Sequence, residues 1–66
     1  MKIAKDLRPV AKLARRQGWT LEQRKGGHLR WQPPAGDYIV TSATPSDARA
    51  VKNARRDLRR AGLAGA

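Results

Sequence analysis

Apolar residues near the start of the chain recur at the spacing of one helix face. The four positions of this stripe are Leu7, Val10, Ala11 and Ala14. Asp6 precedes them and can cap a helix, Pro9 is tolerated in a first helical turn, and Gly18 is a typical C-terminal stop. The pattern therefore predicts a helix over about residues 7–17.

Period-two alternation after this helix predicts strands. The segment WTLEQR places Trp19 and Leu21 on one side and polar residues on the other, and a Lys-Gly-Gly segment then interrupts it. After the turn residues PPAGD, the segment YIVTS predicts a third strand, with apolar side chains on both of its sides. The face on which Tyr38 lies is therefore left undecided.

The segment HLRWQ between these two strands alternates as well. Leu29 and Trp31 fall on one face. The opposite face carries His28, Arg30 and Gln32. We expect both tryptophans of the chain to pack in the core, although an indole can also stack on nucleic-acid bases. Strand parity turns the single histidine away from the core.

A second helix is predicted near the end of the chain, over about residues 45–61. Thr44 is suited to cap it, Pro45 to occupy its first position, and Asp47 to favour its positive end. Its apolar stripe comprises Ala48, Val51, Ala54 or Arg55, and Leu58. The cations on its other faces are Arg49, Lys52, Arg56, Arg59 and Arg60. The helix is thus amphipathic and basic, and Gly62 ends it.

The predicted elements follow the order helix, three strands, helix. Both helices have an apolar stripe to bury, and one antiparallel sheet gives them a shared face. We therefore expect an α+β fold, a two-layer α-β-β-β-α domain with both helices on one face of a three-stranded antiparallel sheet. Residues 1–66 form one domain in this prediction, because so short a chain supports only one thin core.

Composition narrows the class of protein. There are no cysteines, so neither disulfides nor a Cys-based zinc site can add to the core. The mean hydropathy of −0.74 and the short apolar runs exclude a membrane span. The first residues, MKIAKDLRP, lack the apolar stretch of a secretory signal. We expect a soluble protein of the cytoplasm.

Positive charge is the strongest global signal. The chain has 15 lysines and arginines against 5 acidic residues, a net charge of +10. This excess favours a polyanionic partner. Nucleic acid is the first candidate, because arginine binds phosphate through two hydrogen bonds and stacks on bases. Two alternatives also explain the excess of arginine: a basic face that binds an acidic partner protein, and a GC-rich genome that encodes arginine often.

Few residues are suited to catalysis. One histidine and scattered carboxylates do not make the ligand set of a metal site, so no metal or cofactor is expected. No serine lies in a nucleophile-elbow context, and the glycine pair of KGGH is too short for a phosphate-binding loop. The single histidine is therefore the remaining candidate for a catalytic residue.

His28 lies in the segment RKGGHLRW. Two glycines before it leave room for a sugar-phosphate backbone, Gly26 and Gly27. Three nearby cations can hold phosphates, Arg24, Lys25 and Arg30. A neutral imidazole there can take a proton from an RNA 2′-hydroxyl, which then attacks its own phosphodiester. The proton donor to the leaving oxygen stays open among Lys25, Tyr38, water and His28 itself. The simpler alternative is a surface histidine that only contacts phosphate.

The segment GWTLEQRKGGHLRW resembles the core signature of the HicA family, small messenger-RNA interferases of toxin–antitoxin systems. Gly18 and Trp19 match a Gly-aromatic pair, and Lys25 matches a basic residue at the end of a short strand. His28 matches the family histidine, and Trp31 the aromatic residue three positions later. The closing segment RRDLRRAGL is similar to the last helix of the family, so the resemblance spans nearly the whole chain.

This resemblance implies a fold related to the double-stranded RNA-binding domain and an endoribonuclease that needs no cofactor. It implies that His28 is the catalytic histidine and Gly26 the tight glycine of the family. Gly27 stands where the family has serine. The missing hydroxyl leaves two alternatives open: the protein cleaves RNA more weakly, or it binds RNA and no longer cleaves it. The implied substrate is messenger RNA, and the implied partner is an acidic antitoxin of the HicB type that covers His28. The implied location is the cytoplasm of a bacterium, with a bacterial or a phage gene.

Three functions are therefore considered. A HicA-like, metal-independent endoribonuclease is preferred. The alternatives are a nucleic-acid-binding module without catalysis and a small basic inhibitor or adaptor that binds a partner protein. The expected RNA-binding residues are Arg24, Lys25, Gly26, Gly27, Arg30, Arg49, Lys52 and Arg56. The last three have a competing role in docking the acidic antitoxin.

Overall fold

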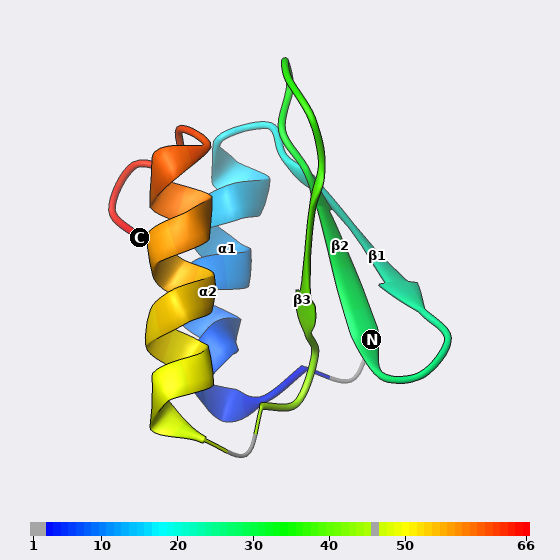
Figure 1. Ribbon diagram of the computed structural model, residues 1–66. Coiled ribbons are helices and arrows are strands. Elements are labelled where there is room, and N and C mark those ends of the chain that lie inside the picture. The colour runs from blue at the N-terminus through cyan, green and yellow to red at the C-terminus, as the bar shows by residue number, and fades with distance from the viewer. Residues whose placement is uncertain (1–2, 46) are drawn as a thin grey trace.

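Two helices and a three-stranded sheet make up the protein. The computed structural model describes residues 3–45 and 47–66. Along the chain, its elements are the 3-10 turn η1 (Lys5–Leu7), α1 (Arg8–Arg16), β1 (Thr20–Arg24), β2 (His28–Gln32), β3 (Ile39–Ser42) and α2 (Ala48–Arg60). Figure 1 shows both helices on one side of the sheet, and this confirms the expected two-layer α+β fold. Within the described ranges, no helix is long and apolar enough to cross a membrane.

The first helix starts differently from the prediction. Asp6 lies inside the 3-10 turn η1, and Leu7, whose side chain has no acceptor, holds the N-cap position of α1. The prediction that Asp6 caps the helix is therefore wrong. Pro9 lies in the first turn as expected, and Gly18 follows the helix with a φ of 85°, a conformation that favours glycine.

The three strands pair in sequence order, with β2 in the middle, and both pairs are antiparallel. The register pairs Arg24 with His28 across the β1–β2 turn, and His28 with Ser42 on β3. β1 and β3 each begin one residue later than predicted, so Trp19 and Tyr38 lie just outside them. Pairing thus brings residues from three segments into rows across the sheet.

The core lies between the helices and the inner face of the sheet. Its largest fully buried side chain is Trp31, whose indole Nε1 donates a hydrogen bond to Thr41 Oγ1 over 2.9 Å. This bond satisfies the polar group that the ring carries into the core. Leu29 is buried on the same strand. Trp19, in the segment that follows α1, is buried as well, so the predicted packing of both tryptophans in the core is confirmed. The helices contribute Val10, Ala11, Ala14, Ala54 and Leu58.

The start of α2 also differs from the prediction. Asp47 is its N-cap, because its backbone is extended and its Oδ1 accepts a hydrogen bond from the Arg49 N–H over 2.9 Å. Thr44 and Pro45 lie before the helix. The prediction that they form its cap and first residue is therefore wrong, and the helix is three residues shorter at this end.

The buried stripe of α2 is narrow. Ala54 and Leu58 are buried and Val51 is half-buried, whereas Ala48 is exposed, contrary to the prediction. Ala54, and not Arg55, takes the position that the sequence left open. The cations of the helix are exposed: Arg49, Lys52, Arg55, Arg56, Arg59 and Arg60.

The segment after α2 folds back towards α1. Leu63 is buried in the core. The Gln17 side chain binds both backbone groups of Ala64: Nε2 donates to the carbonyl oxygen over 2.8 Å, and Oε1 accepts from the N–H over 3.0 Å. These two bonds tie the end of α1 to a residue 47 positions further along the chain.

Candidate active site on the open face of the sheet

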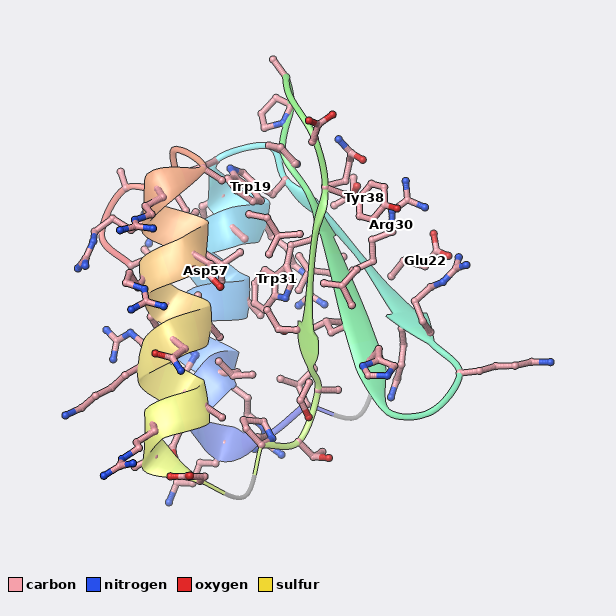
Figure 2. The ribbon with its side chains drawn as sticks, in the orientation of Figure 1. Trp19, Glu22, Arg30, Trp31, Tyr38 and Asp57 are labelled. Carbon is pink, nitrogen blue, oxygen red and sulfur yellow. The ribbon has the colours of Figure 1, made fainter. Side chains whose placement is uncertain are left out.

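The sheet face opposite the helices, which we call the open face, carries mostly polar side chains (Figure 2). Strand alternation and register place on it two rows of residues that cross all three strands. The first row is Arg24, His28 and Ser42, and the second is Glu22, Arg30 and Val40. Since directly opposed residues have Cβ atoms about 4.5–5.5 Å apart, the rows bring side chains of all three strands close together.

His28 is the first residue of β2, and its side chain is exposed, as strand parity predicts. The turn before it contains Gly26 and Gly27, with φ values of 80° and 78° that favour glycine. A Cβ on Gly26 would lie 3.6 Å from His28 Cδ2 and 3.8 Å from Nε2. The imidazole therefore lies beside the bare Cα of Gly26, which leaves the Nε2 edge uncovered.

His28 also lines an open hollow of about 250 Å³ on this face. The other residues that line it are Arg24, Arg30, Tyr38 and Val40. The histidine expected to be catalytic thus shares one hollow with two of the arginines expected to bind phosphate. An imidazole and two guanidinium groups around one open space can move a proton and hold an anion.

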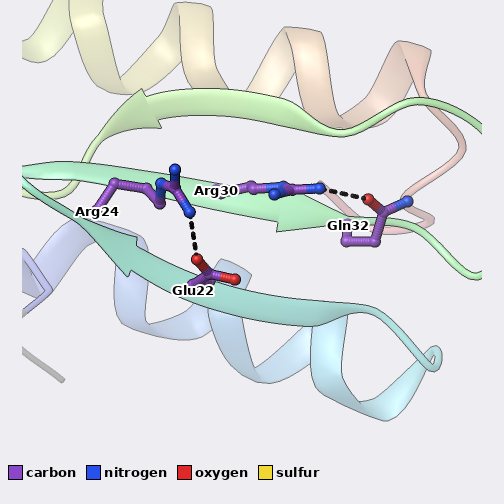
Figure 3. Close-up of polar contacts among 4 residues, drawn as sticks. All are labelled: Glu22, Arg24, Arg30 and Gln32. Carbon is purple, nitrogen blue, oxygen red and sulfur yellow. Dashed lines mark hydrogen bonds and ion pairs between the residues drawn. The ribbon is translucent and has the colours of Figure 1, made fainter.

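The two arginines of the hollow differ in their surroundings (Figure 3). Arg24 Nη1 lies 2.5 Å from Glu22 Oε1, in an ion pair whose members are both more than half exposed. Arg30 has no ion pair in the described part of the chain, and its Nη2 donates a long hydrogen bond of 3.5 Å to Gln32 Oε1. Glu22 therefore offsets the charge of Arg24, while Arg30, which lies opposite Glu22 in the register, makes no ion pair with it.

Lys25 and Tyr38, both considered as proton donors, occupy different places. Lys25 is exposed in the turn and lines a neighbouring hollow with Glu22, Gln23 and Arg24. Tyr38 lines the same hollow as His28. Of these two side chains, Tyr38 is the one that the fold brings to the histidine.

The RNA-binding residues predicted on α2 lie apart from His28. Because α2 packs on the inner face of the sheet, its exposed cations point away from the open face (Figure 2). Lys52 and Arg56 line a groove of about 500 Å³ with Arg55 and Arg59, which we call the α2 groove. Arg49 is exposed in the first turn of α2. The structure therefore divides the predicted RNA-binding residues between two opposite surfaces.

Several residues of the open face were not identified from the sequence. Ser42 lies opposite His28 and Val40 opposite Arg30, but the sequence contains no signal for the register that pairs them. Glu22 was placed on the polar side of its strand without a partner. Tyr38 was considered as a proton donor, but its segment has no clear parity, so its place on this face was not predicted.

No three His, Asp or Glu side chains gather so as to hold a metal ion within residues 3–45 and 47–66. The groups at hand on the open face are imidazole, guanidinium, phenol, hydroxyl and the carboxylate of Glu22, which is paired with Arg24. Comparison of the chain with protein-family models, curated proteins and solved structures found no match.

Proposed function

We propose that this protein is a metal-independent endoribonuclease of the HicA type that cleaves messenger RNA. The observation that carries the proposal is the shared hollow, in which His28 lies with Arg24 and Arg30 on an exposed sheet face. The net charge of +10 attracts a polyanion to the protein. The resemblance of GWTLEQRKGGHLRW to the HicA signature supports the same role for His28.

The reaction is a transesterification within the RNA chain. His28 Nε2 takes the proton of a 2′-hydroxyl, and the 2′ oxygen attacks the adjacent phosphorus. The bond between phosphorus and the 5′ oxygen breaks, and this oxygen takes a proton from the imidazolium or from water. Arg24 and Arg30 stabilise the negative charge that builds up on the phosphoryl oxygens. The products carry a 2′,3′-cyclic phosphate and a 5′-hydroxyl.

The test is a cleavage assay of labelled single-stranded RNA in the presence of EDTA. We expect the parent chain to cleave RNA but not all-DNA strands, and His28→Ala to be slower by about 100-fold or more, because a positioned base contributes at least that factor. Circular dichroism checks that both proteins are folded. Cleavage that depends on added metal, or that survives in His28→Ala, would contradict the proposal.

A second candidate function is RNA binding without cleavage. The observation in its favour is Gly27, which places no hydroxyl in the turn at the position where the HicA signature has serine. In that case neither the parent chain nor His28→Ala cleaves RNA, and both bind it equally in a gel-retardation assay.

The α2 groove has a separate part in the proposal. Its exposed arginines and Lys52 bind the RNA backbone, at a distance from the reacting phosphate. An acidic antitoxin that covers His28 would bind the open face, which leaves the α2 groove accessible in the same complex. In this proposal the protein acts in the cytoplasm of a bacterium, from a chromosomal or a phage gene.

A further inference from the structure

We propose that Tyr38 and Arg30 form a stacking platform for the base of an unpaired RNA nucleotide, next to the phosphate that His28 acts on. The platform would make Tyr38 a substrate-positioning residue and would direct cleavage to single-stranded RNA. This inference rests on the proposed function for the position of the cleaved phosphate, but the platform itself can be tested without cleavage.

The first observation is the exposure of apolar surface at the hollow. In the described part of the chain, the large apolar side chains that lie exposed are Tyr38, at 53%, and Val40, at 51%. Both line the hollow of His28. The remaining large apolar side chains are buried or half-buried. Apolar area is thus exposed on the face that carries the candidate histidine, where a ligand can cover it.

The second observation is the arrangement of Arg30. Its guanidinium carbon lies 4.1 Å from the centre of the Tyr38 ring, a cation–π contact that holds the two planar groups together. Arg30 Nε is buried without a hydrogen-bond partner among the described residues. The guanidinium thus lies against the ring without a ligand, so that less side-chain freedom is lost when a base binds.

The chemistry of the hollow indicates the occupant. Every nucleobase has a planar face that stacks on tyrosine or on a guanidinium plane, and unpaired RNA bases are recognised in this way. Arg24 and Arg30 supply positive charge at the same hollow for the phosphates on either side of that base. In a duplex the bases are already stacked on one another, so only an unpaired nucleotide can reach Tyr38.

The position of the platform relates it to cleavage. Tyr38 lies against Arg30 and lines the same hollow as His28, and His28 precedes Arg30 by two residues on the same face. One nucleotide whose base lies on Tyr38 would therefore carry its phosphate towards His28. The nucleotide beside the cleaved bond, rather than a distant one, is the one whose base is held.

The experiment measures binding of a short single-stranded RNA with one 2-aminopurine, in the His28→Ala background so that the RNA stays intact. We expect the fluorescence of 2-aminopurine to be quenched on binding. Tyr38→Ala should remove the quenching and weaken binding about 10-fold, as removal of one base–aromatic stack does. Tyr38→Phe keeps the ring and should restore both. An RNA with an abasic nucleotide at the same position should bind alike to the tyrosine and alanine variants.

The outcomes separate the two proposals. Quenching that depends on the ring at position 38, together with a parent chain that does not cleave, supports the platform and overturns the ribonuclease. Equal quenching and affinity in Tyr38→Ala, in protein that circular dichroism shows to be folded, overturns the platform even if His28 cleaves RNA. If Tyr38→Ala does not fold, Tyr38→Phe with the abasic RNA decides: an affinity for the abasic strand equal to that for the intact strand overturns the platform.

Discussion

Gly26 and Gly27 adopt nearly the same backbone conformation in different surroundings. Their φ values are 80° and 78°, so that any side chain at either position is strained. A Cβ on Gly26 would touch the imidazole of His28, whereas a Cβ on Gly27 would meet nothing within 4 Å. A comparison of alanine substitutions at the two glycines therefore separates the cost of backbone strain from the effect of covering His28.

We expect Gly26→Ala to slow RNA cleavage by about 10-fold more than Gly27→Ala, because its methyl group covers the Nε2 edge that has to meet the 2′-hydroxyl. Both substitutions should lower the free energy of unfolding by about 1 kcal/mol, the usual cost of a left-handed residue with a Cβ. Cleavage rates and urea denaturation measure the two effects. Equal cleavage rates in the two variants would contradict this role of Gly26.

At the scale of elements, the strands could be predicted more fully than the starts of the helices. Alternation reports which strand residues are buried without knowledge of the partner strand, and so it also predicted that His28 is exposed. A helix cap, in contrast, depends on the backbone conformation of one residue, and the residue type alone does not report it. The extended residue before α2 is Asp47 and not Thr44. The pairing of Ser42 with His28 depends on register, which apolar spacing alone did not define.

The cap of α2 gives a prediction for this element. Asp47→Ala should lower the free energy of unfolding by about 1 kcal/mol, because the Arg49 N–H then loses its acceptor. Thr44→Ala is the matched control, since Thr44 is exposed and lies before the helix, and it should change stability by much less. Urea denaturation followed by circular dichroism compares the two. A larger decrease in Thr44→Ala would mean that the helix starts earlier in solution.

At the scale of the molecule, the positive charge is divided between two layers. The open face holds Arg24 and Arg30 beside His28, and the α2 groove lies on the other side of the sheet. A domain of this size can therefore place its two basic surfaces on different parts of one RNA. The reacting phosphate and the phosphates that provide most of the affinity need not be the same.

This division predicts different effects of substitutions on the two sides. Replacing Lys52 and Arg56 together by glutamine should lower the slope of log affinity against log salt by about 1.4, because each RNA phosphate that is no longer neutralised lowers it by roughly 0.7. Arg30→Gln, which removes a cation without an ion pair among the described residues, should reduce the slope by only about half as much, yet slow cleavage at saturating RNA more strongly. Fluorescence anisotropy over a range of KCl concentrations gives the slopes. An unchanged slope in the Lys52 and Arg56 double variant would exclude the α2 groove from RNA binding.

The bonds between Gln17 and Ala64 have a mechanical consequence. When the chain is pulled from residue 66, the load reaches these two bonds and the buried Leu63 before it reaches the last turn of α2. Under this load, unwinding of α2 from its end first requires the two exposed hydrogen bonds of Gln17 to break and Leu63 to leave the core. The side chain of Gln17 thus opposes unfolding by a pulling force on this end of the chain, such as the force that proteases exert when they thread a substrate.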